Sequence, residues 1–323
     1  MTHSSKFITC LRQGFALLTL GLGGLVASAA NPAEVTVVQV APLTGVLAST
    51  GQQMVLGGKI YFDWINAQGG VHGAKIKHTV LDDGYKVDET VRLTREALVN
   101  PEVIALFGFA GTANISKLLT DGILDVGGAP LVAPYTGGEA LRSPFNPYIF
   151  HVRAGYVDET EHMVHQAATL GMTRIAVMYQ NDAFGKAGLA GVEAAVAKRK
   201  LKLVGTASYE RNTDEVQEAV KQIKATDPQA IIMISVNRST AAFAKQYRAA
   251  GGGGQLYNIS VVDPAELVKL AGLKAVHGLG ISQVVAFPFA AGKPVVREYQ
   301  SLMKKYGGGV PVSYTSFEEF LGA

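Results

Sequence analysis

The segment VTVVQVAPLTGVLASTGQQMVLGGKIYFDWINAQGG, residues 35–70, decides the fold class. Its first seven residues are mostly β-branched and apolar and end at Pro42, which is typical of a buried strand. Apolar residues then recur at helical spacing over Gly51–Gln68, and Gly69-Gly70 ends this helix. The segment therefore predicts a strand followed by a helix.

The same alternation of strand and helix continues to residue 260. In the first half it predicts strands at 76–81, 103–107, 130–133 and 148–152, and helices at 88–99 and 114–124. In the second half it predicts strands at 174–179, 201–207, 230–235 and 256–260, and helices at 158–170, 188–199, 214–225 and 240–250. Short apolar strands that alternate with helices indicate a mostly parallel sheet covered on both faces.

The two halves of the chain also resemble each other. Strand VTVVQV, a loop, Gly51 and a helix recur as strand RIAVMY, a loop, Gly185 and a helix. We therefore expect an α/β fold of two similar lobes, each with a doubly wound parallel sheet. A single (β/α) barrel remains an alternative, because its local patterns are the same.

The composition argues against several classes of protein. The chain has 323 residues, of which 48% are hydrophobic and 17% are charged, so it can form sizeable cores and is not a disordered chain. Its 29 basic and 26 acidic residues give a net charge of +3 without a clustered basic face. Nucleic acid is therefore not an expected partner.

The first 30 residues have the three parts of a secretory signal peptide. Lys6 and Arg12 precede an apolar run over Phe15–Val26, and the small residues ASAA at 27–30 offer a cleavage site. The run is too short to cross a bilayer of about 30 Å. We expect a protein that is exported to the periplasm and is not inserted in the membrane after cleavage.

The motifs of catalysis and of cofactor binding are absent from the sequence. No GxGxxG follows a predicted strand, and GxxxxGK[ST], GxSxG and HExxH do not occur. His162 and His165 share a helix face without a third ligand, which is more typical of a solvated face than of a metal site. Cys10 lies before the apolar run, where no lipoprotein cysteine stands, and its removal leaves no thiol. We therefore expect that the protein is not an enzyme and that it binds neither a cofactor nor a metal ion.

Loops at the carboxyl ends of four predicted strands contain small and hydroxyl residues: PLTG at 42–45, FAGT at 109–112, PYTGG at 134–138 and NDAFG at 181–185. In open parallel sheets such loops meet at one crevice, where exposed backbone amides suit an anionic group such as a carboxylate. Tyr135, Tyr156 and Phe184 are candidates for the apolar walls of that crevice.

Through these loops and the segments around them, the sequence resembles the substrate-binding proteins of branched-chain amino acid type ABC transporters, the Leu/Ile/Val-binding family of type I periplasmic binding proteins. The resemblance is carried by residues 41–76, LDDGYKVDETVRLTREAL at 81–98, FGFAGTANI at 107–115, APYTGGEALR at 133–142, HVRAGY at 151–156 and YQNDAFGKAGLAG at 179–191. It implies two lobes joined by three crossing segments, with a small ligand in the cleft between them. Lobe 1 is expected at 31–155 plus 284–323, and lobe 2 at 156–283.

The resemblance also assigns candidate ligand-binding residues. The hydroxyl that binds the ligand carboxylate falls at Thr112, further contacts fall on Tyr135, Thr136 and Gly137, and the aromatic residue that closes from lobe 2 falls at Phe184. The candidate set comes from both lobes: Thr50, Ala110, Gly111, Thr112, Tyr135, Thr136, Gly137, Tyr156, Phe184, Asn237 and Asp263.

Two positions depart from the family pattern. Amino acid binders of this family hold the ligand ammonium with an acidic residue after the strand that corresponds to 256–260; here that position lies near Val261, and the nearest carboxylate is Asp263. Val236-Asn237 stand where a second aromatic residue of lobe 2 is expected. Because a buried ammonium without a carboxylate costs several kcal/mol, an α-amino acid and a carboxylate without the amine are both open as ligands.

The resemblance leads to one favoured function and two alternatives. The favoured function is an exported, monomeric, non-enzymatic receptor that passes a small ligand to a membrane ABC permease. A ligand sensor of the same fold and an exported α/β enzyme are the alternatives. The chain ends in SYTSFEEFLGA at 313–323, where the family continues, so we expect the last elements of lobe 1 to be missing.

Overall fold

The computed structural model describes residues 33–323. The predicted signal peptide, with Lys6, Arg12 and Cys10, lies outside the described residues. Within 33–323, no helix combines the length and the apolar character that crossing a membrane requires.

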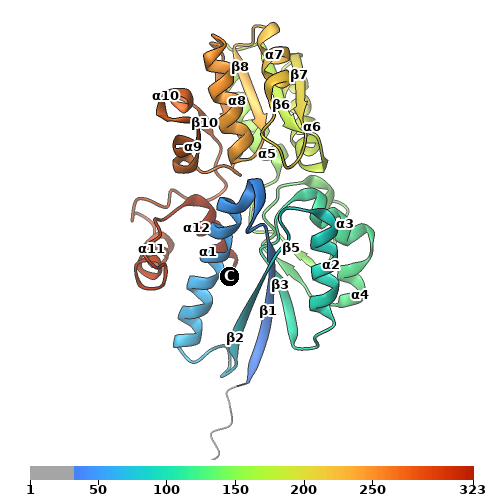
Figure 1. The fold of residues 1–323 in the computed structure, drawn as a ribbon, viewed down its shortest axis with the longest axis vertical. Helices are drawn as coiled ribbons and strands as arrows, with labels where there is room; N and C mark the ends of the chain where they lie inside the picture. The colour runs from blue at the N-terminus through green and yellow to red at the C-terminus, as the bar shows by residue number, and fades with distance from the viewer. Residues whose placement is uncertain (1–32) are drawn as a thin grey trace, which may run out of the picture. The chain divides into compact units, whose positions relative to one another are not determined.

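The first half of the chain forms a parallel five-stranded sheet in the order β2-β1-β3-β4-β5 (Figure 1). The strands are β1 (Glu34–Ala41), β2 (Lys75–Asp82), β3 (Val103–Phe107), β4 (Leu131–Val132) and β5 (Ile149–Phe150). The helices are α1 (Ala48–Ala67), α2 (Val87–Leu98), α3 (Thr112–Thr120) and α4 (Ile123–Gly127), with short 3-10 turns at η1 (Gly45–Leu47) and η2 (Glu139–Leu141). Figure 1 shows α1 on one face of this sheet and α2, α3 and α4 on the other.

The second half repeats this plan in a parallel sheet of order β10-β9-β8-β6-β7. Its strands are β6 (Ile175–Gln180), β7 (Leu203–Tyr209), β8 (Ala230–Ile234), β9 (Gln255–Asn258) and β10 (Gly280–Ile281). Its helices are α5 (Tyr156–Thr169), α6 (Ala183–Lys198), α7 (Gln217–Ala225), α8 (Asn237–Ala249), α9 (Pro264–Ala271) and α10 (Leu273–Val276). Two separate sheets rule out the alternative of a single barrel.

After the second sheet the chain returns to the first. Helices α11 (Pro294–Tyr306) and α12 (Tyr314–Gly322) pack against α1. Ile60 of α1, Tyr299 of α11 and Phe317 of α12 belong to one buried cluster. We call the first sheet with α1–α4, α11 and α12 the first lobe, and the second sheet with α5–α10 the second lobe; the residue boundaries expected from the sequence stay a prediction.

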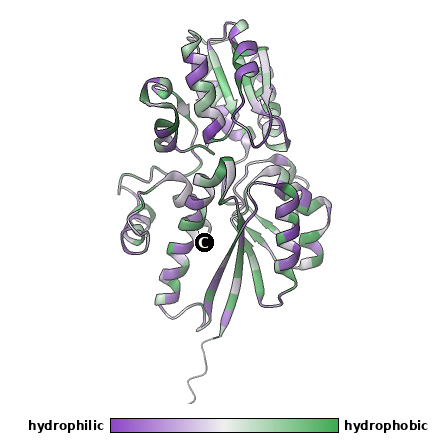
Figure 2. Cartoon of the chain, in the orientation of Figure 1, coloured by the Kyte–Doolittle hydropathy of each residue, from purple (hydrophilic) through white to green (hydrophobic). Residues whose placement is uncertain are grey.

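The central strands are mostly apolar because both of their faces are covered, whereas the edge strands β2 and β7 carry exposed polar residues such as Lys77 and Ser208. In β6, Ile175 and Val177 belong to the buried cluster that includes residues of α5 and α6, whereas Ala176 and Met178 belong to the cluster that includes residues of α7 and α8. Successive side chains point to opposite faces of a strand, so each of these residues is buried in turn. Figure 2 shows the result as largely hydrophobic strands between helices that are hydrophobic on one side.

The repetition between the halves extends to single glycines at the start of α1 and α6. A Cβ atom at Gly51 would lie 2.1 Å from the carbonyl oxygen of Pro42, just after β1. A Cβ atom at Gly185 would lie 1.8 Å from the carbonyl oxygen of Gln180, the last residue of β6. In each lobe the first turn of a helix therefore packs directly against the end of the preceding strand.

Two predicted helices differ most from the observed ones. The helix predicted at 114–124 is divided into α3 and α4 by Gly122, which has a φ of 64°. The helix predicted at 188–199 begins at Ala183, because the Asp182 carboxylate caps it by accepting hydrogen bonds from the amides of Phe184 and Gly185. Phe184 therefore lies in the first turn of α6 and not in a loop.

Candidate functional site

Loops and helix starts from both sheets enclose a small buried space, which we call the inner chamber. Its volume is about 20 Å³, enough for one water molecule. The first lobe contributes Leu47, Tyr85, Ala110, Gly111 and Tyr135, and the second lobe contributes Tyr156, Phe184, Val236 and Val261. All nine residues are buried, so the two lobes are closed over the chamber.

Aromatic rings form much of the chamber wall. Tyr156 begins α5 and meets Phe184 edge to face, with ring centroids 5.5 Å apart. Burial raises the pKa of Tyr85, of Tyr135 and of Tyr156, so these phenols are neutral at physiological pH.

A pair of buried hydroxyl groups belongs to Thr112 and Thr136, which follow the chamber residues Gly111 and Tyr135 in the sequence. The Oγ1 atoms of Thr112 and Thr136 are 2.7 Å apart, and the amide of Gly138 donates to Thr136 Oγ1 at 3.2 Å. Thr112 opens α3, so the unpaired amides of a helix start are close by. The carbonyl of Gly137 accepts a hydrogen bond of 2.8 Å from the amide of Tyr156.

Gly111 makes the close packing of this wall possible. It precedes α3 with a φ of 99°, a conformation that favours glycine. A Cβ atom there would lie 2.4 Å from Oδ1 of Asn114 and 2.8 Å from the ring of Tyr85. Any larger residue at this position would push Tyr85 away from α3.

A second, larger space of about 700 Å³, which we call the outer cavity, is lined by the starts of α1 and α9 and by residues 287–289 and 311–315. Three predicted site residues, Thr50, Asn237 and Asp263, line it. Asn237 Nδ2 donates to Thr50 Oγ1 at 3.1 Å, a hydrogen bond between the lobes. Asn237 Oδ1 accepts from the amide of Asp263 at 2.8 Å.

The predicted site residues thus fall into three groups, because Thr112, Thr136 and Gly137 line neither the inner chamber nor the outer cavity. Ala110, Gly111, Tyr135, Tyr156 and Phe184 line the inner chamber. The Asp263 carboxylate, by contrast, caps α9 by accepting from the amide of Glu266 at 3.0 Å. Val261, two residues earlier, lines the chamber in its place.

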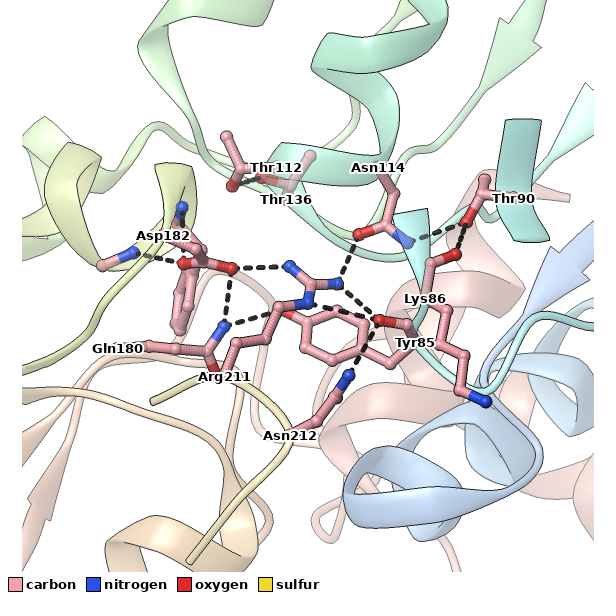
Figure 3. A network of polar contacts seen from close by, with 12 residues as sticks. Tyr85, Lys86, Thr90, Thr112, Asn114, Thr136, Gln180, Asp182, Arg211 and Asn212 are labelled. Carbon is pink, nitrogen blue, oxygen red and sulfur yellow. Dashed lines mark hydrogen bonds and ion pairs between the residues drawn. The ribbon is translucent and has the colours of Figure 1, made fainter. Parts of the chain in front are cut away.

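A cluster that the sequence patterns did not reveal joins the lobes at the chamber wall (Figure 3). Arg211 follows β7, and its Nη2 donates to the carbonyl of Tyr85 and to Oδ1 of Asn114, both at 2.7 Å. Its guanidinium lies 3.6 Å from the centroid of the Tyr85 ring. Within the second lobe it pairs with the Asp182 carboxylate at 2.5 Å. We call Arg211, Asp182, Tyr85 and Asn114 the Arg211 latch.

A second residue that the sequence patterns did not reveal, Arg153, lies in the segment between the sheets. Its side chain is fully buried and forms an ion pair of 3.2 Å with Glu318 of α12. It also donates to Ser260, which follows β9, so it contacts both lobes. The guanidinium lies 4.6 Å from the centroid of the Tyr135 ring. Burial raises the pKa of Glu318 to about 7, although Arg153 acts in the opposite direction.

The described residues contain no group of three or more His, Cys, Asp or Glu side chains that could hold a metal ion. His162 and His165 are exposed on α5, as a solvated helix face requires.

Comparison with known proteins agrees with this architecture. A family model described as periplasmic binding protein matches residues 34–323. The chain belongs to this family. The resemblance seen in the sequence is therefore confirmed.

Relatives of this periplasmic binding protein include Leu/Ile/Val-binding protein homolog 7 of Brucella suis, which is 25% identical over 95% of this chain and 79% of its own length. Among solved structures, a substrate-binding periplasmic protein from Ralstonia solanacearum is 37% identical with a TM-score of 0.86, covering 90% of this chain and 82% of that one. An extracellular ligand-binding receptor from Verminephrobacter eiseniae is 30% identical with a TM-score of 0.83, over the same shares of both chains.

Proposed function

We propose that this periplasmic binding protein is an exported receptor that captures a small amino acid or another carboxylate-containing metabolite and delivers it to a membrane ABC permease. The observation that carries the proposal is the inner chamber, which is enclosed by loops at the carboxyl ends of strands in both sheets. The name of the Brucella suis relative, a Leu/Ile/Val-binding protein homolog, supports a ligand of this size and chemistry.

Within this proposal, the ligand carboxylate is received by the amides of residues 110–112 and the hydroxyls of Thr112 and Thr136. These two hydroxyls now bond to each other, which uses one of their two protons, so one hydroxyl keeps its proton free to donate to a carboxylate oxygen. Tyr135, Tyr156 and Phe184 surround the apolar part of the ligand, and Gly137 keeps Tyr156 in place. Thr50, Asn237 and Asp263 line the entrance at the outer cavity. The protein acts as a monomer and performs no chemistry on the ligand.

Ligand entry requires the lobes to separate, because the chamber in the closed arrangement holds about one water molecule. Separation breaks the Asn237–Thr50 hydrogen bond and the contacts of Arg211 with Tyr85 and Asn114. Closure of two lobes around a ligand is a hinge motion, which converts binding into a change of shape that a permease can recognise.

The proposal is tested by thermal unfolding of the exported protein with a panel of amino acids, 2-oxo acids and other small carboxylates. We expect at least one compound to raise the unfolding temperature and to make the protein more compact in X-ray scattering. A panel without any effect would contradict a role as a carboxylate receptor.

A matched pair of glycine variants controls the location of binding. In Gly137→Ala the new Cβ would lie 2.9 Å from the amide nitrogen of Tyr156, so Tyr156 must move and the ligand effect should fall. In Gly253→Ala the new Cβ meets no atom within 4 Å, so the ligand effect should remain. Equal ligand effects in both variants would place binding away from the inner chamber.

A further inference from the structure

The inner chamber offers no charged partner for an ammonium group. Its nine lining residues include no Asp or Glu, and its polar side chains are three tyrosines. The Tyr85 hydroxyl accepts from Gln180 Nε2 at 3.3 Å, and the Tyr135 hydroxyl bonds to Thr315 Oγ1 at 3.1 Å. Two of the three phenol groups are therefore already engaged by neighbouring side chains.

The carboxylates around the chamber residues are engaged elsewhere. Asp83 accepts from the amide of Tyr85 and from the hydroxyl of Thr90. Glu159 accepts from the amide and the hydroxyl of Ser260 and from the hydroxyl of Ser282. Asp182 pairs with Arg211 and caps α6. Asp263 caps α9 and lines the outer cavity. Glu318 pairs with the buried Arg153. An ammonium group in the chamber would therefore lose its hydration without gaining a counter-charge, and this is strongly unfavourable.

The two rings of the first lobe that line the chamber each carry a guanidinium group. Arg211 lies 3.6 Å from the centroid of the Tyr85 ring, and Arg153 lies 4.6 Å from that of Tyr135. The face of an aromatic ring attracts a cation, and these two rings already satisfy that attraction with arginine. Both guanidinium groups are neutralised by carboxylates, Arg211 by Asp182 and Arg153 by Glu318, so they occupy the two ring faces without adding net charge beside the chamber.

We propose that the ligand is an apolar monocarboxylate without an α-ammonium group, such as a branched aliphatic or aryl-substituted carboxylate. This inference rests on the proposed function and narrows its ligand class. Apolar substituents suit the rings of Tyr156 and Phe184 and the side chains of Val236 and Val261, which are all buried. The carboxylate is the only charge that such a ligand brings into the chamber.

The test compares pairs of compounds that differ only at the α-carbon: 4-methylpentanoate with leucine, and 3-phenylpropanoate with phenylalanine. Isothermal titration of the full exported protein at pH 7 gives the ratio of the two Kd values for each pair. We expect the deaminated member of at least one pair to bind more tightly by about tenfold or more, which is about 1.4 kcal/mol.

The outcomes separate this inference from the proposed function. An amino acid that binds as tightly as its deaminated partner, or more tightly, overturns the ligand class but leaves a solute receptor. Failure of both pairs, together with no effect in the broad carboxylate panel, overturns the ligand class and the proposed function together.

Substitution of Val261 tests whether this position decides the preference. Val261→Asp places a carboxylate in the chamber, and we expect the Kd ratio to shift toward the amino acid by about tenfold. Val261→Asn introduces a side chain of nearly the same shape as that of Val261→Asp but without its charge. This variant should leave the Kd ratio near that of the wild type. The ratio within one variant is insensitive to a general loss of affinity, so a partly destabilised variant remains informative. Equal ratios in the two variants would refute a role of Val261 next to the α-carbon.

Discussion

The Arg211 latch predicts how tightly the closed form is held. Arg211→Ala removes every contact that this side chain makes with the first lobe: the hydrogen bonds to the Tyr85 carbonyl and to Asn114 Oδ1, and the contact with the Tyr85 ring. It retains the Asp182 cap of α6, since the amides of Phe184 and Gly185 still donate to that carboxylate. We therefore expect the second lobe to stay folded and the closed arrangement to weaken.

The size of the effect follows from the interactions that the Arg211 guanidinium makes with the first lobe. A hydrogen bond from a charged donor contributes about 1.5–3 kcal/mol, and a desolvated contact of a cation with an aromatic ring contributes about 2 kcal/mol. These contributions share one side chain and are not additive. We therefore expect the free energy that favours the closed over the open arrangement to fall by about 3 kcal/mol. If the ligand-free protein is open, this corresponds to a Kd about a hundredfold higher, mostly through faster dissociation.

The assay is stopped-flow measurement of ligand association and dissociation, with X-ray scattering of the ligand-free protein. Arg238→Ala is the matched control, because Arg238 pairs with Asp214 at 3.2 Å in the second lobe and about half of its side chain is exposed. An exposed pair of this kind contributes at most about 1 kcal/mol, so its removal should leave both rates nearly unchanged. Arg211→Ala with the dissociation rate and the scattering profile of the wild type would refute the role of the latch.

Three further substitutions test other parts of the structure. Thr136→Val removes the hydroxyl that lies 2.7 Å from Thr112 Oγ1, and we expect carboxylate binding to weaken by about 1–3 kcal/mol in titration calorimetry with unfolding cooperativity preserved; unchanged affinity would contradict its assigned role. Burial lowers the pKa of His78 from 6.5 to about 4. Between these pH values the His78 side chain is neutral in the folded protein but binds a proton in the unfolded chain. Stability should therefore fall by up to about 3 kcal/mol as the pH falls from about 6.5 to 4, and denaturant unfolding of His78→Gln should show a smaller fall; identical pH profiles would disprove this linkage. Gly185→Ala places a Cβ 1.8 Å from the Gln180 carbonyl oxygen and should lower the free energy of unfolding by about 1–3 kcal/mol, whereas a neutral effect would show that α6 moves freely.

The strands and most helices were predictable because their determinants are local. Residues 103–107 are apolar and bounded by turns, and the strand predicted there is β3 (Val103–Phe107) without a shift. The start of α6 was missed because a cap depends on one side chain: Asp182 forms hydrogen bonds with the next turn, and periodicity does not register this. The break between α3 and α4 depends in the same way on a single glycine, Gly122.

Only those parts of the candidate site that lie in loops at strand ends could be predicted from the sequence. Loops at strand ends were expected to converge, and five of the predicted residues do line the inner chamber. Arg211 and Arg153 were missed because their partners are distant in the sequence: Tyr85 is 126 residues from Arg211, and Ser260 is 107 residues from Arg153. A single arginine inside an apolar segment such as HVRAGY was the one available signal for Arg153, because a buried charge needs a partner.

We expect Tyr85 to link closure of the lobes to the ligand, because it belongs to both the chamber and the latch. One part of its ring lines the chamber, and the Arg211 guanidinium lies against the ring at 3.6 Å. Gly111 is fixed close to the same ring, so the ring cannot move toward α3 to admit a larger ligand. A ligand that displaces Tyr85 must therefore also disturb the contacts of Arg211 and lose part of the energy of closure. We therefore expect selection by ligand size to depend on the stability of the closed form, so that Arg211→Ala reduces discrimination against bulky carboxylates as well as affinity.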